Sequence, residues 1–82
     1  MTADEMFEKL GYKKCLDNEY EVEYYIYDIY FTFDKEKKTI QKRVEFDYKC
    51  LAKPVTIQEL QAINKKVKEL GWNEQNNTNE DK

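Results

Sequence analysis

The residues of this chain that could do chemistry are its acids, bases, tyrosines and two cysteines, because the 82 residues include no histidine. Without histidine, Ser-His and Cys-His nucleophiles and histidine-based metal sites are excluded. Cys15 and Cys50 lack the spacing of zinc ligands, and Gly11 and Gly71 fall at predicted helix ends, which leaves no glycine-rich phosphate loop. Carboxylate pairs could hydrolyse glycosides, but that needs a cleft that one small core hardly provides. We therefore expect no enzyme, no catalytic residue, no metal site and no cofactor.

A basic stretch from Lys35 to Arg43 is one candidate for binding. Its five positive side chains are Lys35, Lys37, Lys38, Lys42 and Arg43. On a hairpin they could contact the phosphates of a nucleic acid, with Tyr25 or Tyr30 as a stacking surface. The simpler interpretation is a solvated turn whose charges pair with Glu19, Glu21 and Glu23. A net charge of −3 is too mild to indicate a nucleic-acid binder, so this function is the alternative rather than the first choice.

The tyrosines are the other candidate for binding. The chain has seven of them, and two short helices cannot cover both faces of the predicted sheet, so some tyrosines should be exposed. Tyrosine is enriched at protein interfaces because it offers a large area at little entropy cost. The simpler interpretation is that the rings thicken a thin core. The leading functional interpretation is a protein interface formed by Tyr25, Tyr27 and Tyr30.

Two helices are predicted to flank these residues. In the first, residues 2–10, Thr2 and Glu5 have the spacing of a capping box. The second repeats that spacing at its start, and its apolar stripe then recurs every three or four residues, as one buried helix face requires. The stripe consists of Leu60, Ile63, Val67 and Leu70. Each helix ends at a Leu-Gly-aromatic sequence, which predicts a left-handed glycine cap.

The middle of the chain alternates like antiparallel strands, and residues 12–16 are a plausible earlier strand. Apolar residues occupy even positions from Tyr20 to Ile26 and odd positions from Ile29 to Phe33, so the phase flips near Tyr27 and Asp28. A bulge or a tight turn would explain the flip. The absence of Gly, Pro and Asn favours a bulge or sharp bend.

A polar turn over residues 34–38 leads to a further strand, with one exception to its alternation. Its apolar face is predicted to hold Ile40, Val44, Phe46 and Tyr48. Lys42 interrupts that face. The predicted fold class is α+β: a short N-terminal helix, an antiparallel sheet of three or four strands, and a C-terminal helix packed on one sheet face. Residues 1–72 form a single predicted domain, and the polar residues 73–82 form a predicted disordered tail.

The sequence also suggests a location. No apolar run is long enough for a transmembrane helix, and the acidic N-terminal residues do not look like an export signal. We expect a cytoplasmic protein without membrane contact, in which both cysteines are free, half-buried thiols.

Parts of the sequence resemble a known group of proteins, which suggests a biological setting. The segments 1–12, 29–34 and 57–72, around a tyrosine-rich middle, resemble small proteins of unassigned activity carried by phages and prophages of Gram-positive bacteria. The resemblance implies a cytoplasmic accessory protein of a mobile element and carries over no functional residue. Such proteins often bind a host protein. The predicted function is therefore a non-enzymatic protein-interaction module. Its candidate partners are a host or phage protein, or a second copy through exposed tyrosines or a sheet edge.

Overall fold

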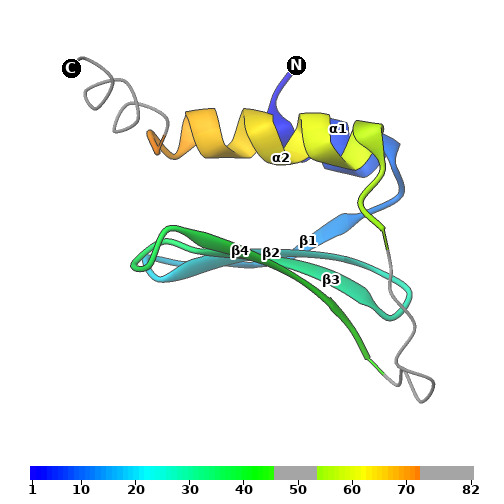
Figure 1. The fold of residues 1–82 in the computed structure, drawn as a ribbon, viewed down its shortest axis with the longest axis horizontal. Helices are drawn as coiled ribbons and strands as arrows, with labels where there is room; N and C mark the ends of the chain where they lie inside the picture. The colour runs from blue at the N-terminus through cyan, green and yellow to red at the C-terminus, as the bar shows by residue number, and fades with distance from the viewer. Residues whose placement is uncertain (46–53, 73–82) are drawn as a thin grey trace.

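The computed structural model describes residues 1–45 and 54–72 and shows an α+β arrangement (Figure 1). Its elements, in chain order, are α1 (Ala3–Lys9), β1 (Lys13–Asp17), β2 (Glu21–Ile26), β3 (Ile29–Asp34), β4 (Thr39–Val44) and α2 (Ile57–Glu69). The strands form one antiparallel sheet in the order β1-β2-β3-β4, and both helices lie on the same side of it. The predicted fold class is confirmed, with four strands.

Some predictions lie outside the described residues. These are the tail 73–82, the continuation of the last strand through Phe46 and Tyr48, and the environment of Cys50.

The helix starts follow the predicted capping chemistry. In α1 the Thr2 hydroxyl accepts the Glu5 amide at 3.1 Å, and the Glu5 carboxylate accepts the Thr2 amide at 2.8 Å. Thr56 and Glu59 repeat both bonds at the start of α2, at 3.0 and 3.1 Å. These contacts satisfy amides that a first helical turn leaves unpaired.

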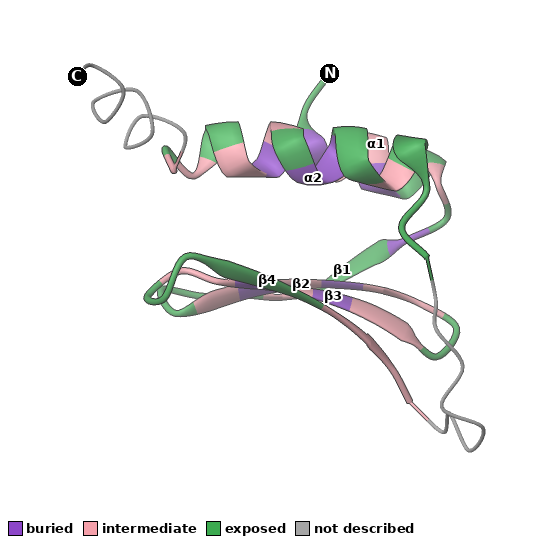
Figure 2. Cartoon of the chain, viewed as in Figure 1, coloured by how far each residue is buried: buried purple, intermediate pink, exposed green. Residues whose placement is uncertain are grey.

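The core lies between the sheet and the helices (Figure 2). Val22 of β2 pairs with Phe33 of β3, and Tyr24 pairs with Phe31, which places these four side chains on the covered face. All four are at most 1% exposed. Phe7 of α1 descends onto them and stacks on Tyr24 with ring centroids 4.1 Å apart. The inward-facing side chains of the alternating strands and the apolar face of α1 thus pack together in one aromatic core.

Of the two explanations for the phase flip, the favoured bulge at Tyr27 and Asp28 is wrong and the tight turn is right: these residues form a two-residue hairpin turn between β2 and β3. Ile26 pairs directly with Ile29 across it, which explains the phase flip without any bulge. Tyr27 adopts a φ of 54°, a conformation that such turns normally obtain from glycine or asparagine. The paired strands hold the turn despite its unfavourable residue. A register shift does occur in β1, between Lys14 and Leu16.

The predicted core position of Leu60 is also wrong, because its side chain is 44% exposed. The buried residues of α2 are Ala62, Ile63 and Lys66. Since α2 packs beside α1 as well as over the sheet, its buried stripe is rotated toward α1. Ala62 and Ala3 of α1 are both 0% exposed, and such small side chains allow a close approach of the two helices.

Candidate functional site

The sheet face opposite the helices is the first feature to consider, since no described helix covers it (Figure 1). We call it the open face. Because side chains alternate along a strand, it receives the neighbours of the core residues. By register it comprises Lys13, Leu16, Glu21, Glu23, Tyr25, Tyr30, Thr32, Asp34, Thr39, Gln41 and Arg43. Two of the three tyrosines that the sequence proposes for an interface therefore face the same way.

Tyr25, Tyr30 and Arg43 form a stacked ladder across three strands. Tyr25 pairs with Tyr30, and Tyr30 pairs with Arg43. The two rings are 5.9 Å apart with an interplanar angle of 22°, and the Arg43 guanidinium carbon lies 4.4 Å from the Tyr30 ring centroid. Stacked aromatic pairs and cation–π contacts each hold the rings in a defined position. The ladder is therefore preordered.

Tyr27 lies at the tip of the same hairpin. Its side chain is 86% exposed. Together with Tyr25 it lines a hollow of about 300 Å³, whose other lining residues are Gly11, Lys13 and Ile26. We call Tyr25, Tyr27, Tyr30 and Arg43 the tyrosine strip. A bulky residue at positive φ is an outlier, and such outliers cluster at binding sites.

The charge of Arg43 is already compensated. Its guanidinium contacts the carboxylates of Glu45 at 3.0 Å and Glu23 at 3.2 Å. Glu23 also accepts the Thr32 hydroxyl at 2.7 Å. Desolvation and the Glu45 carboxylate both raise the pKa of Tyr30, so its hydroxyl stays protonated at neutral pH. The ladder thus presents a neutral aromatic surface.

The basic stretch does not form one surface. Lys42 and Arg43 point to opposite faces of β4: the Lys42 ammonium lies 3.2 Å from Glu59 of α2 and 5.3 Å from the Phe31 ring centroid. It also donates to the Pro54 carbonyl at 2.7 Å. This pairing accounts for the lysine that interrupts the predicted apolar face. The simpler interpretation, in which the basic stretch pairs with the acidic residues of a neighbouring strand, is confirmed in part, because Arg43 of β4 reaches over β3 to Glu23 of β2.

The three remaining lysines lie in the turn between β3 and β4. Lys35 donates to the Asn18 carbonyl at 2.6 Å and lies 3.5 Å from the Asp17 carboxylate. Lys37 and Lys38 are exposed. Of the five predicted phosphate contacts, three gather at this turn, and only two of those three have no described ion-pair partner.

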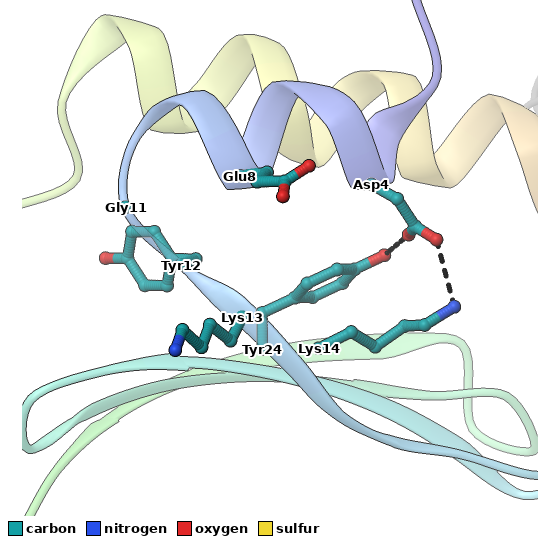
Figure 3. A pocket seen from close by; sticks show the side chains of 7 residues that line it. All are labelled: Asp4, Glu8, Gly11, Tyr12, Lys13, Lys14 and Tyr24. Carbon is teal, nitrogen blue, oxygen red and sulfur yellow. Dashed lines mark hydrogen bonds and ion pairs between the residues drawn. The ribbon is translucent and has the colours of Figure 1, made fainter.

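A second hollow, of about 470 Å³, lies between α1 and β1 (Figure 3). Its charged and aromatic groups are linked to one another: Asp4 accepts a short hydrogen bond from the Tyr24 hydroxyl and another from Lys14 at 2.9 Å. Burial opposes ionisation of Asp4, but these bonds outweigh it and lower the carboxyl pKa. Burial and the same bond raise the pKa of Tyr24. At neutral pH Asp4 is therefore ionised and Tyr24 neutral, an arrangement that joins elements rather than transferring protons.

Glu59 makes an equivalent junction at the other side of the core. One carboxylate oxygen accepts the Tyr12 hydroxyl at 2.8 Å, and the other accepts the Thr56 amide and the Lys42 ammonium. Burial opposes ionisation of Glu59, but these three bonds lower its pKa. Burial and the bond to Glu59 raise the pKa of Tyr12. Lys42 thus ties the last described strand to α2.

The remaining chemistry is limited. Within residues 1–45 and 54–72, no group of three Cys, Asp or Glu side chains is arranged to hold a metal ion. Cys15 is a free thiol, as predicted, but the residue is exposed rather than half-buried. Partial burial of its sulfur and the neighbouring Glu23 raise its pKa. A thiol with a raised pKa is a weaker nucleophile at neutral pH. In the described part of the chain, no helix has the length and hydropathy needed to span a bilayer.

The structure adds residues that the sequence analysis missed. Lys13 and Ile26 line the hollow beside Tyr27, and Gly11 comes close to them with a φ of 97°. A Cβ at Gly11 would lie 2.8 Å from Ile26 Cδ1. The signal for Gly11 was present as a helix cap, but nothing local indicates that the end of α1 meets the tip of the β2–β3 hairpin. Comparison of the chain with family models, with curated proteins and with solved structures finds no match in any of the three.

Proposed function

We propose that this protein is a non-enzymatic protein-binding domain that contacts its partner through the tyrosine strip. The observation that supports it is the hairpin tip: Tyr27 is 86% exposed at a φ of 54°, beside the preordered Tyr25–Tyr30 stack. Folding alone would favour glycine at this turn position. Exposed, rigid aromatic side chains are typical of interface hot spots, because little rotamer entropy is lost when they are buried.

A protein is favoured over a nucleic acid by the charges around the strip. Glu21, Glu23 and Asp34 share the open face with the tyrosines, and Glu45 lies beside Arg43. Four carboxylates on or next to a stacking surface repel a phosphate backbone. Of the basic residues, Lys13 and Arg43 lie on the same face, so the four carboxylates outnumber them. Lys42 lies on the covered face, and the remaining lysines of the basic stretch lie in a distant turn. The acidic surroundings therefore suit a protein surface better than a polynucleotide.

The tyrosine strip is also favoured over the sheet edges as the contact. β1 is short and carries a register shift, and β4 has the charged Lys42 on its covered face. Bulges and inward-pointing charges are both devices that discourage an added strand. Pairing of two copies through either edge would have to accommodate them.

The proposed setting is the cytoplasm of a bacterial cell that carries a mobile element. This part of the proposal derives from the resemblance to small phage and prophage proteins. The partner in that setting is a host or phage protein, and the domain acts by occupying its surface.

The test is capture of partners by the immobilised chain and its variants. We expect a partner captured by the parent chain to be lost with Tyr27→Gly and with Tyr25→Ser, and to be kept at high salt. Tyr20→Ser is the matched control, because Tyr20 is 58% exposed but outside the strip. Equal losses with Tyr20→Ser, or capture of nucleic acid that declines steeply with salt, would contradict the proposal.

A further inference from the structure

We propose that the hollow between Tyr25 and Tyr27 receives an aromatic side chain of the partner whose neighbouring carboxylate pairs with Lys13. This inference rests on the proposed function and specifies the chemistry that the tyrosine strip recognises. The recognised unit is an aromatic ring with a negative charge within a few bonds of it.

The aromatic walls of the hollow come from one hairpin. Tyr25 stacks on Tyr30, which in turn carries Arg43, so the Tyr25 ring is held before any partner arrives. Tyr27 is held by its backbone in a two-residue turn. The Tyr25 ring is therefore fixed in advance, which reduces the ordering cost of binding. Aromatic walls of this kind favour another ring, in stacked or edge-to-face contact.

Part of the lining of the hollow is apolar. Ile26 and Gly11 line it, and the space for a Gly11 side chain is taken by Ile26 Cδ1 at 2.8 Å. A volume of about 300 Å³ is at the lower limit of ligand pockets, which suits one side chain rather than a larger molecule. An apolar lining also favours a ring over a hydrated polar group.

The charge of the hollow points to a carboxylate. Lys13 is the one charged side chain among the described residues that line it. Unlike Lys14, which lies 2.9 Å from Asp4 and 3.0 Å from Asp17, Lys13 forms no ion pair within the described chain. An exposed ammonium beside an aromatic hollow, without a carboxylate partner among residues 1–45 and 54–72, selects an anion next to the bound ring.

A nucleotide also joins a ring to an anion. The charges around the hollow distinguish a nucleotide from a peptide group. Asp28 is exposed in the same turn as Tyr27, and Glu45 donates its amide to the Asp28 carbonyl at 2.8 Å, which places Glu45 near the turn as well. One carboxylate could be oriented toward Lys13 and away from these acids. A run of phosphates could not, which favours the peptide group.

The experiment is a titration of the full chain, labelled with ¹⁵N, with N-acetylphenylalanine and with its uncharged amide. We expect amide shifts at Gly11, Lys13 and Ile26, saturating at millimolar ligand, and weaker binding of the uncharged compound. Lys13→Gln should weaken binding of the acid about two- to five-fold, as expected for an exposed ion pair. Lys9→Gln, a change at an exposed lysine of α1, is the control and should bind the acid as the parent does.

The outcomes separate this inference from the proposed function. Equal binding of acid and amide, or shifts elsewhere in the spectrum, would overturn the Lys13 pairing. Tighter binding of oligothymidylate than of the acid would overturn the peptide chemistry. If the acid fails to bind while Tyr27→Gly still abolishes partner capture, the inference fails and the proposed function stands. If the acid binds and capture is indifferent to the tyrosines, the proposed function fails instead.

Discussion

Tyr24 and Tyr25 are neighbours in sequence, yet they serve the two faces of the sheet in opposite ways. Tyr24 is 1% exposed, stacks on Phe7 and donates to Asp4. Tyr25 stacks on Tyr30 on the open face. Both faces thus carry a stacked aromatic pair, but only one pair is sealed by helices (Figure 2). The comparison teaches that residue type sets the kind of contact, and the covering layer sets whether that contact stabilises the fold or remains available to a partner.

The largest expected effect is the contrast between these two tyrosines. Tyr24→Ala should lower the free energy of unfolding by about 3–5 kcal/mol, because it empties the centre of the core. Tyr25→Ala should cost about 1 kcal/mol, the value of one aromatic pair. Urea denaturation followed by circular dichroism measures both. Similar losses for the two variants would show that the open face is as structural as the covered one.

A smaller effect is expected at the carboxylate junction behind the covered face. Glu59→Gln should lower the free energy of unfolding by about 1–3 kcal/mol, because an acceptor of three hydrogen bonds loses its charge. Glu8→Gln is the matched control, since Glu8 is exposed and its carboxylate has no described bond. Its unfolding free energy should stay within about 0.5 kcal/mol of the parent chain.

The pH dependence should reveal the same covered-face junctions. Asp4 and Glu59 have folded-state pKa values below their ordinary 3.8 and 4.5. Their stabilisation is therefore complete above those values and is lost as the pH falls through the lowered pKa. Tyr12 and Tyr24 have raised pKa values, so their contribution is present below pH 10 and declines above it.

Unfolding midpoints from pH 2 to pH 11 measure this profile. Asp4→Asn and Glu59→Gln should flatten the acid side, and Tyr24→Phe should flatten the alkaline side. If the unfolding midpoint still falls at acid pH in the double variant Asp4→Asn/Glu59→Gln, other carboxylates cause that loss of stability.

The smallest expected effect has the opposite sign. Tyr27→Gly should raise the free energy of unfolding by about 1 kcal/mol, because glycine adopts the positive φ of the turn without steric cost. Tyr27→Ala keeps that cost and should give no such gain. Thermal unfolding compares the two. If both variants lose the partner and only Tyr27→Gly is stabilised, Tyr27 contributes to binding and lowers the stability of the fold.

Much of the fold could be predicted because its signals are local. The capping boxes at Thr2 and Thr56 and the strand alternation each depend on residues a few positions apart. The turn at Tyr27 is one of the two alternatives that the sequence offers, but it is not the favoured one, because its residues contradict the usual turn chemistry and only the pairing of β2 with β3 sustains them. Leu60 was misassigned because the sequence shows the apolar stripe of α2 but not its second neighbour, α1.

The candidate site was predictable in part for the same reason. Tyr25 and Tyr30 were placed on one surface by alternation once the hairpin formed. Gly11 could not be named, because it reaches the hollow through the packing of the end of α1 against the hairpin tip. Lys13 could not be named either, because only the pairing of β1 with β2 places it opposite Tyr25. Alternation already separates Lys42 from Arg43, but only the position of α2 shows that Lys42 pairs with Glu59 on the covered face.

The sequence by itself determined the helices, the strands, their caps and the two-sided character of the sheet, because capping and side-chain alternation act over a few residues. Only the tertiary structure decided which face the helices cover, which charges are compensated and where Lys13 meets Tyr25 and Tyr27. Those outcomes depend on contacts between segments distant in sequence, whose free energy is set by burial and geometry that no local pattern contains.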